Sequence, residues 1–383
     1  MKTHTQSDLL ELFPIKLVGG FIAIDAHAGC VGCSFCLSRR HRFWQKAFAA
    51  NWHESGLFHS VEQALNILSQ MKPFTRARIP LRFGHNTDGL FQWDFASGLY
   101  KELPPENPCI ILTRFPIPNK HVTLLQGQNN LIVKMTITPP SASLGISTDV
   151  EALLSQISRL PQENIYVLIG PVTGDNWQMV PEILERLPTG LWLDIKPLTR
   201  EGIPGMDAVP VCDADIIGNL RQIAADKGFQ VTDFFGCLLR KRLKRPFYKA
   251  GSAPDYCLPV CRNCEQNELC FCERRKTPRH DLIRRHASDI GLELGEIKET
   301  GHRAVHVECA QPTSRGDETY LSEITGTRVT ISSVPGGSEG GTFDQTPDEI
   351  LVRWESHGLL PVTALRKLAQ DALQRWHDSG CQL

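Results

Sequence analysis

Three cysteines near the start of the chain are spaced two residues apart. They are Cys30, Cys33 and Cys36, in the stretch GCVGCSFC. A structural zinc site needs four ligands and usually takes them from two CxxC-type pairs separated by a loop. The spacing here matches instead the first three cysteines of the bacterial ferredoxin run, whose fourth position is Arg40 in this chain. We therefore expect a [4Fe–4S] cluster in which one iron has no protein ligand and is open to a small molecule.

A second group of cysteines lies later in the chain, in the stretch CLPVCRNCEQNELCFC. Cysteines are rarely paired as disulfides in a reducing compartment, and grouped cysteines indicate metal ligands. The candidate ligands of this group, with one cysteine upstream of it, are Cys237, Cys257, Cys261, Cys264, Cys270 and Cys272. They would hold either a fully liganded second [4Fe–4S] cluster or zinc. The four isolated cysteines, Cys109, Cys212, Cys309 and Cys381, are expected to be small buried hydrophobic residues.

The elements that must position these residues alternate between short apolar runs and amphipathic segments. Strands are expected at 16–25, 79–84, 109–115, 130–138, 164–171 and 190–197. Helices are expected between them at 60–71, 93–103, 148–160, 176–187 and, after the last strand, 212–229, with Thr148 as an N-cap. Successive βα units indicate a parallel sheet that is covered on both faces. A doubly wound sheet and a partial TIM-like barrel both fit this pattern.

In either architecture the active site lies at the carboxyl ends of the strands. The first cysteine group directly follows the first expected strand. Polar residues also follow the other strands: His85, Asn86, Thr87, Asp88, Thr113, Arg114, Thr136, Thr138, Asp194 and Lys196. We expect these side chains to converge on one rim of the sheet, together with Asp25 and the cysteine loop.

The cysteine loop after the first strand, with Phe35 before the third cysteine, resembles that of the radical S-adenosylmethionine (radical SAM) superfamily. The family loop is C-x3-C-x-aromatic-C, whereas the first gap here has two residues. The resemblance implies an α/β fold with a partial (β/α)6 TIM-like barrel. It also implies that SAM binds the open iron and is cleaved reductively to a 5′-deoxyadenosyl radical, which abstracts hydrogen from a substrate. A reductant such as flavodoxin or ferredoxin would supply the electron.

The segment FGHNTDGL resembles the second-strand segment of relatives of spore photoproduct lyase, and the Thr-Arg pair at 113–114 resembles the end of their next strand. The resemblance implies that Asn86, Thr87 and Asp88 lie on the SAM side and that Thr136 contacts the ribose. Arg114 or Lys134 would meet the SAM carboxylate. No residue is assigned to the hydrogen abstraction itself.

The second cysteine group also resembles a family pattern. Cys261, Cys264 and Cys270 match the C-x2-C-x5-C core of SPASM-type auxiliary clusters, although the next gap has one residue instead of three. The surrounding residues 236–286 contain 13 Lys and Arg against 5 Asp and Glu. A basic segment with interleaved aromatic residues is typical of a nucleic-acid surface, and it would also attract an acidic peptide or a phosphorylated metabolite.

The net charge and the amino-acid composition predict a cytoplasmic protein without a membrane partner. The net charge is −1 with 41% hydrophobic and 22% charged residues, which is ordinary for a globular protein. No run approaches the roughly 20 apolar residues of a membrane helix, and no signal-peptide pattern is found. Three domains are expected: a barrel at 1–235, a basic cysteine-rich auxiliary module at 236–286, and a small α+β domain at 287–383. The last would contain strands at 303–310 and 327–334 and a final helix at 363–378.

Three functions follow from these patterns. The leading hypothesis is a radical SAM enzyme that modifies or repairs a nucleic acid, because of the basic module and the likeness to spore photoproduct lyase relatives. The second is a radical SAM enzyme that modifies a peptide or protein, because of the SPASM-like spacing. The third is a non-enzymatic, zinc-bound nucleic-acid-binding protein, which would hold zinc at both sites and would not bind SAM.

Overall fold

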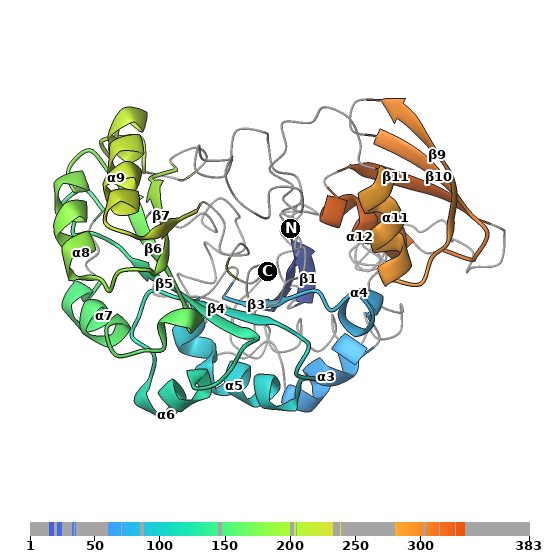
Figure 1. The fold of residues 1–383 in the computed structure, drawn as a ribbon, viewed down its shortest axis with the longest axis horizontal. Helices are drawn as coiled ribbons and strands as arrows, with labels where there is room; N and C mark the ends of the chain where they lie inside the picture. Colours follow the sequence, from blue (N-terminus) through green and yellow to red (C-terminus); the bar gives the residue numbers. More distant parts are fainter. Residues whose placement is uncertain are drawn as a thin grey trace, which may run out of the picture.

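The computed structural model describes two units built from separate sheets (Figure 1). The described residues are 15–18, 21–24, 33, 35, 60–69, 71–84, 88–144, 148–199, 203, 205–232, 238, 280–301, 304–313, 315–325 and 327–333. Among them, no helix has the length and apolar character needed to cross a bilayer.

The first unit is an eight-stranded sheet whose strands follow one another in chain order. They are β1 (Ile15–Val18), β2 (Phe21–Ile24), β3 (Leu81–Phe83), β4 (Cys109–Thr113), β5 (Leu131–Ile137), β6 (Ile165–Val172), β7 (Trp192–Pro197) and β8 (Gln230–Val231). β1 pairs with β2 antiparallel, and every later pair is parallel, so seven strands form a parallel sheet. A doubly wound sheet reverses its strand order at a switch point, and this sheet does not. The fold is therefore α/β and consistent with a partial barrel.

The first expected strand, 16–25, is wrong in one respect. It is a hairpin of β1 and β2, in which Ile15 faces Ile24 and Val18 faces Phe21. Two glycines, Gly19 and Gly20, separate the paired ends in the sequence, and Gly-Gly between apolar runs is a signal for a two-residue hairpin loop. β8 was also not predicted, because two residues are too few for a recognisable pattern.

Helices lie along the convex side of this sheet (Figure 1). They are α3 (Val61–Ser69), α4 (Lys72–Thr75), α5 (Trp93–Glu102), α6 (Asn119–Val122), α7 (Val150–Ile157), α8 (Val180–Arg186) and α9 (Ala214–Asp226). Short 3-10 segments occupy Gly89–Gln92, Thr123–Leu125, Gln162–Asn164 and Trp177–Met179. The cap predicted at Thr148 is wrong, because Asp149 accepts the hydrogen bond from the Ala152 amide. The Thr148 hydroxyl instead donates to the Thr138 carbonyl at 3.0 Å.

The two faces of the sheet are packed differently. Side chains alternate along each strand, so that one set meets the helices and the other set faces the concave side. The helix-facing set, which includes Phe83, Ile111 and Val133, belongs to the large hydrophobic core. The concave set forms a smaller apolar floor of Phe21, Ile110, Ile132 and Tyr166, to which Leu238 from beyond β8 is added, with Leu112 and Trp192 packed against it.

The second unit is a three-stranded sheet covered by two helices. Its strands are β9 (Leu294–Gly301), β10 (Ala304–Cys309) and β11 (Arg328–Ser333), in the order β11-β10-β9, and its helices are α11 (His280–Asp289) and α12 (Arg315–Thr325). β10 is antiparallel to β9 and parallel to β11, and α12 makes the crossover that a parallel pair requires. The strands predicted at 303–310 and 327–334 are confirmed. The expected domain boundary between residues 286 and 287 falls inside α11.

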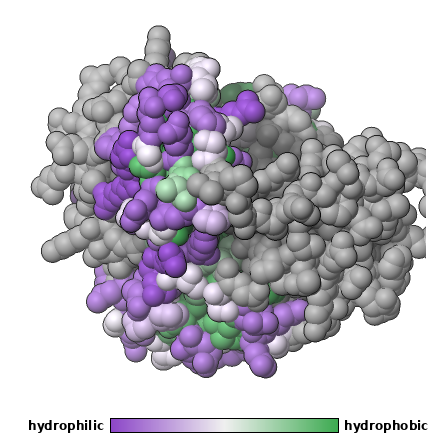
Figure 2. All heavy atoms as spheres, turned by 90° about the vertical axis from the view of Figure 1, so that its right-hand side faces the viewer, coloured by the Kyte–Doolittle hydropathy of each residue, from purple (hydrophilic) through white to green (hydrophobic). Residues whose placement is uncertain are grey.

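The second unit packs directly against the first. Lys72 of α4 binds the buried carboxylate of Asp317 at 3.1 Å, and Arg76 donates to the Ile290 carbonyl at 3.3 Å. Gly291 follows with a φ of 78°, a left-handed conformation that favours glycine, and a Cβ there would displace the Arg76 guanidinium. Ile283 of α11 belongs to the same hydrophobic core as the barrel-like sheet. Figure 2 shows that the described residues on this side of the molecule are mostly hydrophilic.

Candidate functional site

Cys33 lies on the rim that is formed by the carboxyl ends of the parallel strands. The guanidinium of Arg114, which directly follows β4, donates to Cys33 Sγ at 3.6 Å and lies 4.6 Å above the ring of Phe35. Cys33 is 4% exposed. The hydrophobic residues that enclose it with Phe35 are Leu144, Leu198, Ile203, Met206 and Val209. They come from the loops after β5 and β7, so the cysteine is enclosed by several strand ends at once.

Asp88 fixes the position of Arg114. It is buried, and its two carboxylate oxygens accept hydrogen bonds from the Thr113 hydroxyl at 2.8 Å and from the Arg114 amide at 2.9 Å. The Thr113 hydroxyl oxygen in turn accepts a hydrogen bond from the Phe115 amide at 3.0 Å. These bonds determine the backbone direction at the end of β4. The structure therefore brings together Cys33, Asp88 and Arg114, which the sequence placed on three different strand ends.

Lys134 lies on the concave face, two residues after the floor residue Ile132. It is partly buried, as is expected for a side chain that rises from an apolar floor. This burial is the main cause that lowers the pKa of Lys134 to about 7, and the nearby cations Lys196 and Arg82 lower it further. Asp194 raises the pKa and so opposes the shift only in part. Thr136, the next residue on this face, is also buried.

Asp194 and Lys196 of β7 form an ion pair further along the sheet, with Asp194 in the row of Thr136 and Leu168. The carboxylate of Asp194 is 2% exposed and lies 3.2 Å from both Lys196 Nζ and Arg221 Nη2. β8 pairs with β7 at Trp192 and Leu193, near the start of β7. Arg221 of α9 bonds to the later part of β7. Its Nε donates to the Ile195 carbonyl at 3.1 Å.

Many of the predicted site residues lie outside the described residues. These are Cys30, Cys36, Asn86 and Thr87, and the six cysteines Cys237, Cys257, Cys261, Cys264, Cys270 and Cys272. Within the described part of the chain, no three Cys, His, Asp or Glu side chains are grouped to hold a metal. The predicted burial of isolated cysteines is confirmed for Cys109, Cys212 and Cys309, and Cys381 is not among the described residues.

Two charged residues of the concave rim were not singled out from the sequence. Arg82 occupies the middle of the short strand β3, where the alternation of Leu81, Arg82 and Phe83 could have placed it on the concave face. Arg221 reaches the rim from a helix that packs on the other side of the sheet. No sequence pattern would have predicted that contact, because it depends on how short β8 is.

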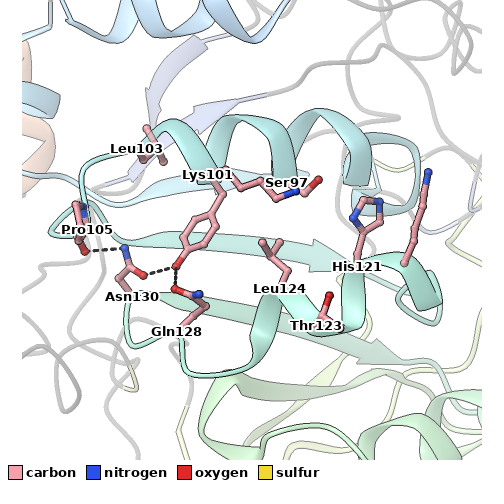
Figure 3. A pocket seen from close by; sticks show the side chains of 11 residues that line it. Ser97, Lys101, Leu103, Pro105, His121, Thr123, Leu124, Gln128 and Asn130 are labelled. Carbon is pink, nitrogen blue, oxygen red and sulfur yellow. Dashed lines mark hydrogen bonds between the residues drawn. The ribbon is translucent and has the colours of Figure 1, made fainter.

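A pocket of about 480 Å³ lies away from this rim, between α5 and the segments that follow β4 (Figure 3). The Tyr100 hydroxyl forms hydrogen bonds with Gln128 Oε1, at 2.8 Å, and with Asn130. Asn130 in turn donates to the carbonyls of Pro105, at 2.7 Å, and Asn107, at 3.0 Å. These groups hold loops together at the amino ends of the strands, so their hydrogen bonds serve the fold.

Two comparisons with known proteins were made for this chain. No protein-family model matches the chain, and the search of curated proteins also gave no match. Any account of function therefore depends on the residues of the rim and on the cysteine spacing.

Proposed function

We propose that the chain is a radical SAM enzyme. Cys30, Cys33 and Cys36 would hold a [4Fe–4S] cluster whose open iron binds SAM, and reductive cleavage of SAM would supply a 5′-deoxyadenosyl radical that takes hydrogen from a substrate. The observation that carries this proposal is the buried Cys33, held under Arg114 at the carboxyl ends of a consecutive parallel sheet. This is the end at which enzymes of barrel architecture place their chemistry.

The surroundings of Cys33 fit a cluster ligand. A cysteine that ligates iron is a thiolate, and a buried negative charge needs a partner. The Arg114 guanidinium supplies one at 3.6 Å from Sγ. The apolar neighbours Leu144 and Leu198 restrict water. Hydrogen bonds to the sulfurs and solvent exclusion are the two means by which a protein tunes such a cluster.

The position of Arg114 also fits the SAM carboxylate. Both Arg114 and Lys134 were candidates, but only Arg114 contacts the cysteine loop among the described residues. A carboxylate bound at an iron next to Cys33 would lie within reach of this guanidinium, which offers two parallel donors. In this account Asp88 is a positioning residue that orients Arg114 by holding its backbone amide. Asn86 and Thr87 on the SAM side and Thr136 at the ribose remain part of the proposal.

The leading substrate class is a nucleic acid, which would be modified or repaired. Its support is the basic composition of residues 236–286 together with the segment at 83–90 that resembles spore photoproduct lyase relatives. The SPASM-like spacing of Cys261, Cys264 and Cys270 favours a peptide or protein as the alternative substrate. The second cysteine group would hold a further [4Fe–4S] cluster or zinc, and flavodoxin or ferredoxin would be the reductant in the cytoplasm.

Anaerobic reconstitution tests the proposal. The full chain should bind iron and sulfide and should form 5′-deoxyadenosine from SAM when dithionite is added. A chain that holds the first cluster intact and yet leaves SAM uncleaved would refute the enzyme. Zinc at both cysteine groups without SAM binding would establish the non-enzymatic alternative. A salt-sensitive complex with RNA or DNA, but not with acidic peptides, would select the first substrate class.

A further inference from the structure

The turn at residues 173–176 follows β6 and contacts the two loops that enclose Cys33. One is the loop after β5, which supplies Leu144 to the enclosure. The other is the loop after β7, which supplies Leu198, Ile203, Met206 and Val209. Within the turn, Asn176 is buried, and its Oδ1 accepts a hydrogen bond from the Thr173 amide at 2.8 Å. The turn is thus held in one shape, from which both loops can be positioned.

The contact between this turn and the loop after β7 is made by the backbone. The Gly174 amide donates to the Pro210 carbonyl at 2.9 Å, and Thr173 forms an antiparallel bridge with Val211. A Cβ at Gly174 would lie 2.8 Å from Pro210 Cβ and 3.1 Å from the Val211 oxygen, so glycine permits this close approach. These contacts do not involve the side chain of the next residue, Asp175.

The contact between the turn and the loop after β5 depends on the carboxylate of Asp175. Asp175 Oδ2 accepts hydrogen bonds from the Ser141 hydroxyl at 2.9 Å, from the Ser143 hydroxyl at 2.9 Å and from the Ser143 amide at 3.2 Å. The other oxygen accepts from the Thr173 hydroxyl within the turn. Ser141 Oγ also accepts from the Leu144 amide at 3.2 Å. Residues 141–144 are therefore folded around this carboxylate, and Leu144 is joined to it through Ser141.

Asp175 is exposed at the surface, whereas the residue that it helps to hold is not. Partial burial raises its pKa, but the hydrogen bonds from Thr173, Ser143 and Ser141 outweigh this effect and lower the pKa to about 2. Hydrogen bonds to a charged acceptor are stronger than those between neutral groups. Leu144 is 2% exposed and belongs to the same apolar cluster as Cys33. A charged surface group thus holds a turn whose last residue covers the cysteine.

We propose that Asp175 is a positioning residue for the site at Cys33, because it holds residues 141–144 so that Leu144 keeps water away from the cysteine sulfur. A reduced cluster carries one more negative charge than an oxidised one, and exclusion of water makes that charge less stable. The cover provided by Leu144 would therefore lower the reduction potential of a cluster bound there. The proposal rests on the proposed function in one respect, the identification of Cys33 as a ligand of the first cluster.

Alkylation of the full chain before reconstitution tests the cover without a cluster or SAM. Iodoacetamide reacts only with a thiol that it can reach, and mass spectrometry of a digest locates the label. D175A should speed the alkylation of Cys33 about tenfold, the effect of one lost charge-assisted hydrogen bond on local opening. Cys109 of β4 is fully buried and reports on global unfolding, so its rate should stay unchanged.

Three further variants trace the effect to Leu144. L144A removes the cover itself and should speed alkylation of Cys33 as D175A does. The double variant D175A/L144A should be no faster than L144A, because both changes act through the same side chain. S141A removes the hydroxyl that joins the Leu144 amide to Asp175 and should change the rate in the same direction.

A matched control comes from the same connection between β5 and α7. Asp149 is another exposed carboxylate, and it accepts a hydrogen bond from the Ala152 amide at the start of α7. D149A should lower the stability of the helix and leave the alkylation rate of Cys33 unchanged. It therefore separates loss of the cover from loss of a surface carboxylate.

The reconstituted chain gives a second readout. The first cluster is the one whose electron paramagnetic resonance signal changes when SAM is added. D175A and L144A should both raise the midpoint potential of this cluster, because water stabilises the additional negative charge of the reduced state. D149A should leave the potential at its wild-type value.

Four results would overturn the proposal. They are an unchanged alkylation rate of Cys33 in D175A, equal acceleration of Cys33 and Cys109, additive effects of D175A and L144A, and a midpoint potential that D175A leaves unchanged. Faster alkylation of Cys33 in D175A, in a chain that binds a cluster without cleaving SAM, would refute the proposed function and leave the role of Asp175 intact. SAM cleavage with an unchanged alkylation rate would do the reverse.

Discussion

The two ends of the same parallel sheet are built from different chemistry. At the amino ends, neutral side chains such as Tyr100, Asn130 and Asn164 close the loops, and Asn164 alone donates to the carbonyls of Gln128 and Leu131 at 2.7 Å each. At the carboxyl ends, Arg114, Lys134 and their charged neighbours cluster around an apolar floor.

Neutral amides and hydroxyls that satisfy one another stabilise a fold without attracting a ligand. Like charges held close together do the opposite: they destabilise the empty protein and stabilise a complex with an anion. The hydrogen bonds beside Tyr100 and Asn130 therefore serve stability, although they line a pocket, whereas the carboxyl rim is the end at which we propose that a ligand binds.

The largest effect is expected at the cysteine loop. Replacing Cys30, Cys33 and Cys36 together by Ala should abolish 5′-deoxyadenosine formation, because no thiolate is left to hold the first cluster. Replacing Cys261, Cys264 and Cys270 by Ala should leave SAM cleavage in place. Product analysis by liquid chromatography compares the two triple variants. Equal loss in both would mean that SAM cleavage does not depend specifically on the amino-terminal loop.

Arg114 should come next. R114M should weaken SAM binding about 100-fold, through loss of a charge-assisted, two-donor contact with the carboxylate. K134M should change SAM affinity far less, since it is the Arg114 guanidinium that contacts Cys33 Sγ. Equilibrium binding of SAM to the reconstituted variants measures both constants. A larger effect of K134M than of R114M would assign the carboxylate to Lys134 instead.

At the amino ends of the strands, a substitution is expected to change only the stability of the protein. N130A should lower the free energy of unfolding by about 2 kcal/mol, because the carbonyls of Pro105 and Asn107 and the Tyr100 hydroxyl each lose a buried partner. Urea denaturation measures the change. SAM cleavage should stay at the wild-type value at temperatures where the variant is folded, and its loss would erase the contrast between the two ends.

The smallest effect is the pH dependence of stability. The folded-state pKa of Lys134, about 7, lies below the ordinary value of 10.5, so the unfolded chain binds more protons between these pH values. Stability should therefore rise with pH from about 7 upward, by on the order of 1 kcal/mol per pH unit at most. In K134M this contribution should be lost. Urea denaturation at pH 7 and at pH 9 compares the two proteins, and a rise of the same size in K134M would assign it to another group.

The sequence predicted the regular part of the fold well. Strands β3 to β7 were expected from short, mostly apolar runs, because a strand that is covered on both faces has few polar positions. The choice between a doubly wound sheet and a barrel could not be made from those runs, since both contain the same units. The consecutive strand order has no switch point and is consistent with a partial barrel.

The site was predicted only where residues adjoin a strand end in sequence. Arg114, which follows β4, was singled out in that way, whereas Lys134 lies inside β5, and the roles of both at SAM stay predictions. Asp88 was placed beside SAM, and its observed bonds to Thr113 and Arg114 could not be foreseen, because they depend on the three-dimensional course of the loop. Arg221 was missed because its contact with Asp194 crosses from a helix to the edge of β7.

The open iron can be assigned to the amino-terminal cysteines with the second cysteine group removed. The triple variant of Cys261, Cys264 and Cys270 to Ala should still bind about four iron atoms per chain after anaerobic reconstitution. With dithionite it should form 5′-deoxyadenosine from SAM. Such a result would place the open iron at Cys30, Cys33 and Cys36. A variant that binds this amount of iron and sulfide and forms no 5′-deoxyadenosine would contradict the account.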